Sequence, residues 1–175
     1  MADPEIERFR RVVASAYSSL EARRQEVNDL NVFPVADGDT GDNMAMTMRA
    51  VMEEMERLDD GRSLDEIGRE QLVSSLARAA LMGARGNAGV ILSQIVRGAA
   101  EELASRPGEL VDPVLVASAF ASAADAAYES VREPAEGTML TVFREMAHSI
   151  ARQLAHLEPG RQRLDPGASA EQQDD

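Results

Sequence analysis

Three aspartates close together in the sequence are the residues of this chain best suited to do chemistry. Asp37, Asp39 and Asp42 follow a short apolar segment and are separated by small residues. Carboxylates held this close repel one another, so a fold keeps them together only when a positive charge lies between them. Mg²⁺ takes one or two carboxylates and completes its octahedral shell with water and substrate phosphate. Because Gly38 and Gly41 permit sharp backbone turns, the pattern predicts a magnesium–phosphate site where a loop meets a helix.

Two other interpretations of this segment follow from the same spacing. The aspartates could form an acidic surface loop in which Asp42 or Asn43 only caps the next helix. An EF-hand calcium loop fits less well, because its required glycine would fall on Asp42 and its bidentate glutamate on Met48. Calcium binding by that route is therefore not expected.

A second candidate segment is Gly83–Gly89, with the sequence Gly-Ala-Arg-Gly-Asn-Ala-Gly. It stands directly before an apolar helical run that begins at Val90. Backbone N–H groups at the start of a helix carry the positive end of its dipole and can hold phosphate. The segment is not a Walker A loop, because no Gly-Lys-Ser/Thr ends it. A corner where two helices pack closely would explain the same glycines, so both interpretations stay open.

The composition indicates a soluble, helical protein of one domain. The 175 residues are 44% hydrophobic and only 3% aromatic, with no Trp, so the core must be built from aliphatic residues and the nine Met. The net charge of −13 argues against nucleic acid or an anionic membrane surface as the main partner. There is no Cys, no signal-peptide core and no apolar run approaching ~20 residues. We therefore expect a cytoplasmic protein without a membrane span.

Apolar spacings of three and four residues predict six helices and no strand. In chain order, these helices run from about Pro4 to Asn28, from the aspartates to about Asp60, from Leu72 to Met82, from Val90 onward, from Asp112 and Pro113 onward, and from Met139 through Ile150. A capping-box pattern at Ser63 precedes the third. We expect an antiparallel helical bundle over residues 1–157 and a loose tail over residues 158–175.

The methionines and histidines are interpreted as structural. One face of the second predicted helix carries Met44, Met48, Val51, Met52 and Met55. Such a stripe is typical of core packing. His148 and His156 lie on the last predicted helix without a Cys or a positioned Ser, so we expect them at the surface and find no support for a nucleophilic triad.

Three segments resemble one protein family. They are Leu-Asn-Val-Phe-Pro-Val-Ala-Asp-Gly-Asp-Thr-Gly-Asp-Asn-Met from Leu30, Ala-Leu-Met-Gly-Ala-Arg-Gly-Asn-Ala-Gly-Val-Ile-Leu-Ser-Gln from Ala80, and Glu-Gly-Thr-Met-Leu-Thr-Val from Glu136. The chain resembles the L-type domain of dihydroxyacetone kinases, and most closely the N-terminal kinase domain of bacterial fatty acid kinase. The resemblance runs from about Phe9 to His156, and its first motif is long and distinctive.

The resemblance implies an all-α, barrel-like bundle of about eight antiparallel helices that binds ATP or ADP at one end through two Mg²⁺ ions. Asp37 and Asp39 would be the catalytic metal ligands, with Asn31 near a third ligand position and Asp42 as a further candidate. The residues expected to contact the nucleotide are Thr40, Gly41, Asn43, Met44, Gly86, Asn87, Ala88, Gly89, Thr138 and Met139.

Three departures from the family pattern bear on these expectations. Ala88 stands where relatives usually carry Ser, and Asp42 replaces a usually neutral residue. Relatives also continue through two more helices, so about six of the usual eight are expected here. The segment Asp165-Pro-Gly167 resembles an element of that later part but follows Thr138 too soon.

The function implied by the resemblance is ATP–Mg²⁺-dependent phosphoryl transfer together with a separate protein that presents the acceptor. The first hypothesis is a fatty acid kinase, which transfers the γ-phosphate to a carboxylate held by a fatty-acid-binding protein; the Asn-Val-Phe-Pro-Val lead-in and the Arg-Gly-Asn segment favour it. The alternatives are a dihydroxyacetone (glycerone) kinase subunit and a non-catalytic nucleotide-binding regulatory module, the latter suggested by Ala88 and the early end. The oligomeric state stays open, with a homodimer as one option.

Overall fold

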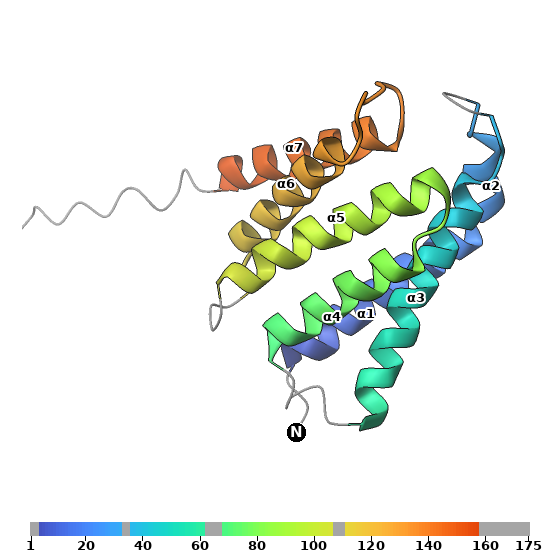
Figure 1. Cartoon of the computed structure of the whole chain (residues 1–175). Helices are drawn as coiled ribbons and strands as arrows, with labels where there is room; N and C mark the ends of the chain where they lie inside the picture. Colours follow the sequence, from blue (N-terminus) through green and yellow to red (C-terminus); the bar gives the residue numbers. More distant parts are fainter. Residues whose placement is uncertain (1–3, 33–35, 62–67, 107–110, 158–175) are drawn as a thin grey trace, which may run out of the picture.

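The architecture is helical throughout the part of the chain that the structure describes. The computed structural model describes residues 4–32, 36–61, 68–106 and 111–157. Its helices are α1 (Pro4–Ala22), α2 (Arg24–Asp29), α3 (Thr40–Gly61), α4 (Arg69–Gly83), α5 (Gly86–Ser105), α6 (Pro113–Glu129) and α7 (Met139–Leu157) (Figure 1). No strand occurs within these four ranges, so the predicted all-α fold class is confirmed.

The first predicted helix is divided, which corrects the expected count of six to seven within the described ranges. The break falls at Arg23, whose backbone angles are φ −110° and ψ 13°. No Gly or Pro marks this position in the sequence. The reason is tertiary: α2 packs on the beginning of α3, and Arg24 and Asn28 both contact Asp42. The predicted capping box at Ser63 and the predicted tail over residues 158–175 lie outside the described residues.

Local signals place the other helices close to their predicted positions. The clearest is the start of α6, where Oδ1 of Asp112 accepts the N–H of Leu115 at 2.8 Å and Pro113 occupies the first turn. This side-chain cap satisfies a donor that the helix itself leaves without a partner. The predicted helix start at Asp112 and Pro113 is therefore confirmed.

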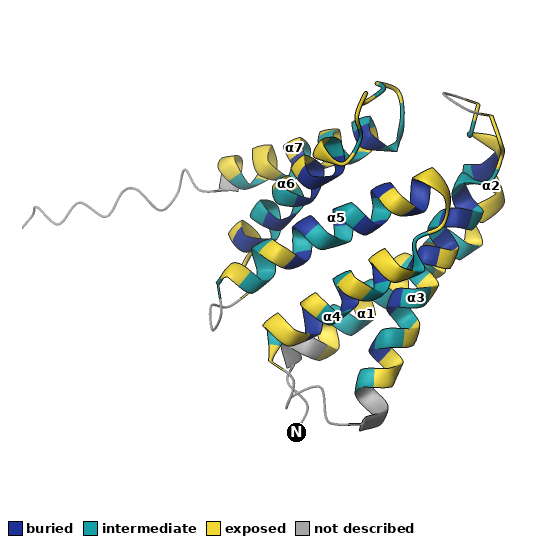
Figure 2. Cartoon of the chain, viewed as in Figure 1, coloured by how far each residue is buried: buried dark blue, intermediate teal, exposed yellow. Residues whose placement is uncertain are grey.

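Two apolar clusters form the core, and α5 contributes to both. The first consists of Val51, Met55, Leu72, Leu76 and Ala80, with Phe9, Val13, Met48, Leu58 and Val96 packed against it. The second consists of Ile91, Ile95, Ala123, Ala127 and Leu140. The predicted methionine stripe on α3 faces this core, since Met55 is buried and Met44, Met48 and Met52 are half-buried (Figure 2).

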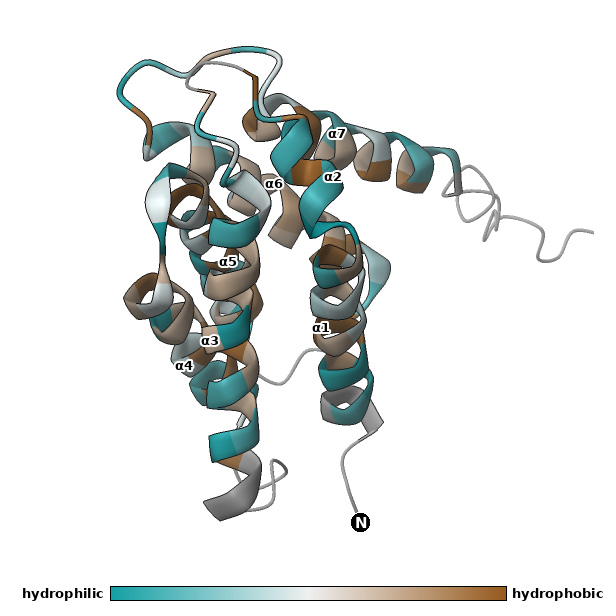
Figure 3. Ribbon diagram, turned by 90° about the vertical axis from the view of Figure 1, so that its right-hand side faces the viewer, coloured by the Kyte–Doolittle hydropathy of each residue, from teal (hydrophilic) through white to brown (hydrophobic). Residues whose placement is uncertain are grey.

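The long helices from α3 onward run in alternating directions (Figure 1). Because of this alternation, the loop before α3 and the loop between α6 and α7 lie at the same end of the bundle, as Figures 1 and 3 both show. The α4–α5 turn also contacts the beginning of α3. The three segments that resemble the kinase family thus come from one end of the molecule. None of the described helices is long and apolar enough to cross a membrane.

Candidate functional site

Asn28 on α2 organises the first turn of α3. This amide is 7% exposed, and its Oδ1 accepts the N–H of Gly41 at 2.7 Å and that of Asp42 at 3.2 Å. Its Nδ2 donates to Oδ2 of Asp42 at 3.1 Å. A Cβ on residue 41 would lie 2.2 Å from the carbonyl oxygen of Arg24, so only glycine permits this approach of α2 to α3. Asn28 therefore caps α3 from a neighbouring helix.

Asp42 has two partners within the protein. In addition to Asn28, its Oδ1 lies 3.2 Å from Nε of Arg24. Among the described residues, no group of three or more acidic or histidine side chains is placed to hold a metal ion. In this part of the chain the three aspartates are not gathered into one group, and the cation nearest Asp42 is Arg24.

Asp37 and Asp39 remain as the oxygen donors of the loop. Asp37 is exposed and Asp39 half-buried, on either side of Gly38, whose φ of 67° is accessible mainly to glycine. Nδ2 of Asn31 donates to Oδ1 of Asp37 at 2.5 Å, which orients that carboxylate. Two hard-oxygen carboxylates, with water and phosphate completing the shell, are the donor set that Mg²⁺ takes in nucleotide sites, so these residues fit the ion.

The α4–α5 turn packs tightly on α3, and two of its glycines are required for that contact. A Cβ on Gly83 would lie 2.3 Å from Cβ of Ala50, and one on Gly89 would lie 2.4 Å from Oγ1 of Thr47. Thr47 is fully buried, donates to the carbonyl of Asn43 at 2.8 Å and accepts the N–H of Arg85 at 3.3 Å. The packing interpretation of this glycine-rich segment is therefore confirmed for Gly83 and Gly89.

The middle of the same segment has the features of a phosphate cradle. Gly86 begins α5 with φ 56°, and a Cβ there would lie 2.2 Å from Nδ2 of Asn43. No side chain in the described structure caps this helix. Gly86 and Asn87 are exposed, whereas Ala88 is 8% exposed and Gly89 is buried. The first N–H groups of α5, beside the Asn43 amide, are thus open donors at the positive end of a helix dipole.

The two helix N-termini at this end are not equivalent. In α3, the N–H groups of Gly41 and Asp42 are taken by Asn28, and that of Asn43 donates to the carbonyl of Asp39 at 2.9 Å. These donors are not directed at a ligand. Three of the residues predicted to contact the nucleotide lie in α3 with partly or fully buried side chains. Asn43 is buried beside Gly86, and Thr40 and Met44 are half-buried. Backbone binding of phosphate is thus favoured at α5 over α3.

The α6–α7 loop places its two predicted residues in structural positions. Oγ1 of Thr138 donates to the carbonyl of Ala135 at 2.8 Å and accepts the N–H of Leu140 at 3.3 Å, so it caps α7. Met139 is half-buried against the second apolar cluster. The side chains of Thr138 and Met139 thus both have structural partners. A nucleotide contact from this loop would come from its backbone and from the surface around Thr138.

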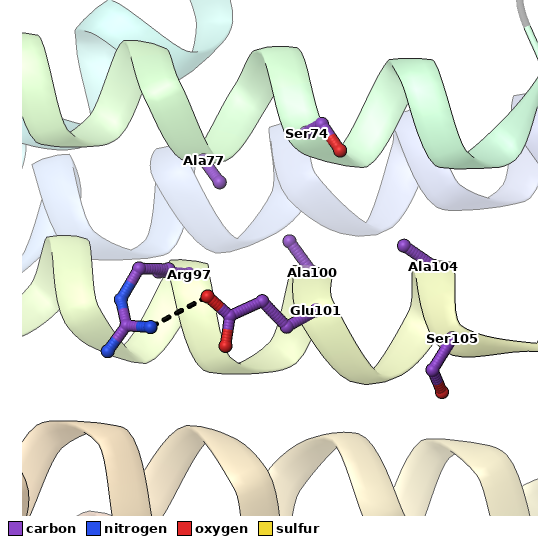
Figure 4. Close-up of a pocket in the computed structure, with 7 residues that line it drawn as sticks. All are labelled: Ser74, Ala77, Arg97, Ala100, Glu101, Ala104 and Ser105. Carbon is purple, nitrogen blue, oxygen red and sulfur yellow. Dashed lines mark hydrogen bonds and ion pairs between the residues drawn. The ribbon is translucent and has the colours of Figure 1, made fainter.

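A groove elsewhere on the molecule lacks converging polar groups. It has a volume of about 420 Å³ and lies between α4 and the second half of α5 (Figure 4). Its walls are mostly small side chains, and its two charged residues, Arg97 and Glu101, pair with each other at 2.6 Å. The two histidines of α7, His148 and His156, are exposed as predicted.

Sequence comparison matches this chain to a protein family and to several bacterial proteins. The DAK2 domain family matches residues 34–170. Protein YloV of Bacillus subtilis (strain 168) is 39% identical over 139 residues, which cover 79% of this chain and 24% of that protein. Two Staphylococcus aureus proteins, from strains bovine RF122 / ET3-1 and USA300, are 35% identical over 150 residues and 37% over 141, covering 86% and 81% of this chain but 26% and 24% of theirs.

The fold and the family match define a kinase-associated, nucleotide-binding helical domain. The chain belongs to the DAK2 domain family, so the predicted dihydroxyacetone-kinase L-type resemblance is confirmed. Members of this family bind ADP or ATP and work with a substrate-binding partner subunit. The chain spans only about a quarter of the length of these relatives.

Two residues of the site escaped the sequence analysis. Asn28 and Thr47 are buried polar side chains that connect α3 to α2 and to the α4–α5 turn. Their partners lie 13 and 38 positions away in the sequence. The only available signal was a polar residue on an otherwise apolar helical face, which is too common to single them out.

Proposed function

We propose that this chain is the nucleotide-binding part of an ATP–Mg²⁺-dependent phosphotransferase whose acceptor is a fatty acid carboxylate presented by a partner protein. The observation that carries the proposal is the pairing of Asp37 and Asp39 with an uncapped α5 N-terminus at one end of a DAK2-family bundle. Anionic oxygen donors for a cation and backbone donors for phosphate are the two requirements of a metal–nucleotide site.

Each group has a defined task in this proposal. Asp37 and Asp39, with Asn31 orienting Asp37, would hold Mg²⁺, and the N–H groups of Gly86, Asn87 and Ala88 would hold phosphate oxygens beside the Asn43 amide. Bound Mg²⁺ supplies charge neutralisation of the triphosphate, which a chain of net charge −13 needs before it can accept a polyanion. The protein contributes mainly position and electrostatics, as phosphoryl transfer requires.

A carboxylate acceptor suits a site with no evident base. In the transfer, a carboxylate oxygen forms a bond to the γ-phosphorus while the bond from that phosphorus to the β–γ bridging oxygen breaks, leaving an acyl phosphate and ADP. The acceptor is already deprotonated at neutral pH, because a carboxylic acid has a pKa of about 4 to 5. No general base is then required, in agreement with the position of both histidines on the exposed surface of α7.

Exposed apolar side chains at this end of the bundle support an acceptor-presenting partner. These side chains are Leu30, Val32, Met46, Leu81, Met82 and Val90, called the apolar rim below. Met82 is 74% exposed at the end of α4, and Leu30 is 73% exposed beside the aspartate loop. Large exposed apolar side chains at the same end of a molecule as a polar site are typical of protein interaction surfaces. The dihydroxyacetone-kinase alternative also involves a partner protein and differs in the acceptor.

The test measures binding and transfer separately. Calorimetry with ATP and ADP, each with and without Mg²⁺, should give Mg²⁺-dependent binding that Asp37→Asn and Asp39→Asn weaken by at least about tenfold, because each removes a charged metal ligand. Asp29→Asn is the matched control, since Asp29 is exposed on α2 and bonded only to Gln25 in the described structure. Circular dichroism checks that all three variants stay helical.

Transfer is then followed with radiolabelled ATP in the presence of fatty acid and its carrier protein, or of dihydroxyacetone and its binding subunit. Acyl phosphate formation supports the proposal. Transfer only to dihydroxyacetone would move the chain to the other kinase branch, and nucleotide binding without transfer would leave a binding module. Equal Mg²⁺-nucleotide affinity in the parent and both aspartate variants would contradict the site itself.

A further inference from the structure

A network of four polar side chains bridges the α6–α7 loop. Glu136 lies in this loop and its carboxylate accepts three bonds: from Oγ1 of Thr141 at 2.7 Å, from Nη2 of Arg144 at 2.8 Å and from the hydroxyl of Tyr128 at 3.5 Å. Tyr128 belongs to the end of α6, and Thr141 and Arg144 belong to the first turns of α7. The network therefore joins the two helices across the loop that connects them.

The network closes on itself by two further contacts. The N–H of Gly137 donates to Oγ1 of Thr141 at 2.9 Å, so that hydroxyl accepts from the loop backbone while it donates to Glu136. The guanidinium carbon of Arg144 lies 4.8 Å from the centre of the Tyr128 ring, a cation–π distance. Glu136 thus contacts the other three members, and Tyr128 and Arg144 also contact each other, which fixes geometry better than one exposed ion pair.

The helix pair does not need this network in order to pack. The rings of Phe120 and Phe143 stack with centroids 5.7 Å apart, and Ala123, Ala127 and Leu140 are buried between α5, α6 and α7. The polar network lies at the surface instead, with the side chain of Glu136 60% exposed. Its position fits the control of loop conformation, because Gly137, at φ 77°, and Thr138, which caps α7, lie between Glu136 and Thr141 in the chain.

We propose that Tyr128, Glu136, Thr141 and Arg144 form a clasp that positions the Gly137–Met139 segment for nucleotide binding. This inference rests on the proposed function, because the α6–α7 loop lies at the end of the bundle where that function places the nucleotide. The four side chains are positioning residues: they act through the loop backbone and not by contact with the reacting atoms. Hydrogen bonds from Thr141 and Arg144 hold the pKa of Glu136 below its ordinary value, so the clasp is charged at neutral pH.

The experiment removes one charge at a time in the full chain. Glu136→Gln keeps the shape of the side chain and weakens its bonds to Arg144 and Thr141. Arg144→Gln removes the positive partner of the same ion pair. We expect each to weaken Mg²⁺-nucleotide binding about fivefold, to raise KM for ATP by a similar factor and to leave kcat within about twofold. Because both substitutions break the same Glu136–Arg144 ion pair, the double variant should bind Mg²⁺-nucleotide no more weakly than either single variant.

Glu101→Gln is the matched control. Its partner Arg97 lies at 2.6 Å, and its side chain is 62% exposed, so the ion pair resembles that of Glu136 but lies in the second half of α5. It should leave nucleotide affinity unchanged. Hydrogen exchange of the Gly137 amide provides a readout besides activity, and it should accelerate in Glu136→Gln and stay unchanged in Glu101→Gln.

Three outcomes separate the possibilities. Faster exchange together with weaker nucleotide binding supports the clasp. Faster exchange with unchanged affinity and KM would overturn it and leave a purely structural network. A parent protein that binds no Mg²⁺-nucleotide would overturn the proposed function, and with it the assignment of this loop.

Discussion

The residue that does most to shape the candidate site is a buried amide. Asn28 satisfies the N–H groups of Gly41 and Asp42 with one oxygen and holds the Asp42 carboxylate with its nitrogen. A carboxylate at this position could not donate to Asp42, and a hydrophobic side chain could not accept from the helix. The choice of asparagine therefore determines both how α3 begins and how the Asp42 carboxylate is held.

Asn28→Ala tests this role directly. The substitution leaves two N–H groups and one carboxylate at the start of α3 without their amide partner, so we expect the free energy of unfolding to fall by about 1–3 kcal/mol. Urea denaturation followed by circular dichroism measures the change. Gln25→Ala is the control on the same short helix, because Gln25 only donates to Asp29 at the surface, and its effect should stay within about 0.5 kcal/mol. Equal stabilities of the two variants would contradict the capping role.

At the scale of the helices, α1 is held against α3 by a polar contact as well as by the apolar cluster. Arg49 on α3 donates to the hydroxyl of Tyr17 at 3.3 Å and to Oε1 of Glu21 at 3.0 Å. Tyr17 also donates to Glu21 at 2.9 Å. The hydrogen bond from Tyr17, followed by that from Arg49, lowers the pKa of Glu21 below its ordinary value of 4.5.

The direction of this pKa shift fixes a pH dependence. A depressed carboxyl pKa stabilises the fold above its ordinary value and ceases to do so as the pH falls through the lowered, folded-state pKa. Arg49→Gln should therefore lower the urea midpoint at pH 7, and the difference from the parent should shrink once the pH is below 4.5. Arg57→Gln, which interrupts a pair within α3 alone, is the control for the loss of a surface arginine. A difference for Arg49→Gln that grows on acidification would contradict the assignment.

At the scale of the molecule, one end of the bundle combines polar groups with exposed apolar side chains. The chain as a whole is acidic, but the end that carries the three family motifs combines open helix donors with the apolar rim. A polar site with exposed apolar side chains at the same end of the bundle favours a protein partner that seals the site and excludes water during transfer. The apolar rim would then contribute to partner recognition without contributing to nucleotide affinity.

Substitutions in the apolar rim should separate these two functions. Leu81→Gln and Met82→Gln should raise the partner concentration needed for half-maximal transfer by about three- to tenfold, because apolar side chains at interfaces contribute on this scale. The nucleotide dissociation constant should stay unchanged. Val114→Gln is the control, since Val114 is 47% exposed in the first turn of α6, at the opposite end. Rim and control variants with the same partner dependence would exclude docking on this surface.

The sequence by itself determined the helices, the starts of most of them and the three segments that carry the family pattern. These features depend on local interactions: apolar spacing selects the helices, and the Asp112 cap acts on a residue three positions away. The chemistry expected of Asp37 and Asp39 likewise follows from residue type and spacing. Local signals of this kind can be identified in a sequence before any fold is known.

Only the tertiary structure decided which of these groups are available to a ligand. The pairing of Asp42 with Arg24, the division of the first helix at Arg23 and the open N-terminus of α5 depend on contacts between separate helices. The same holds for the glycine-rich turn, where Gly83, Gly86 and Gly89 all permit close approach to α3 but only Gly86 stays exposed. Gly83 is half-buried and Gly89 is buried. Contacts of this kind have no periodic signature in the sequence, because their partners are brought together only when the helices pack.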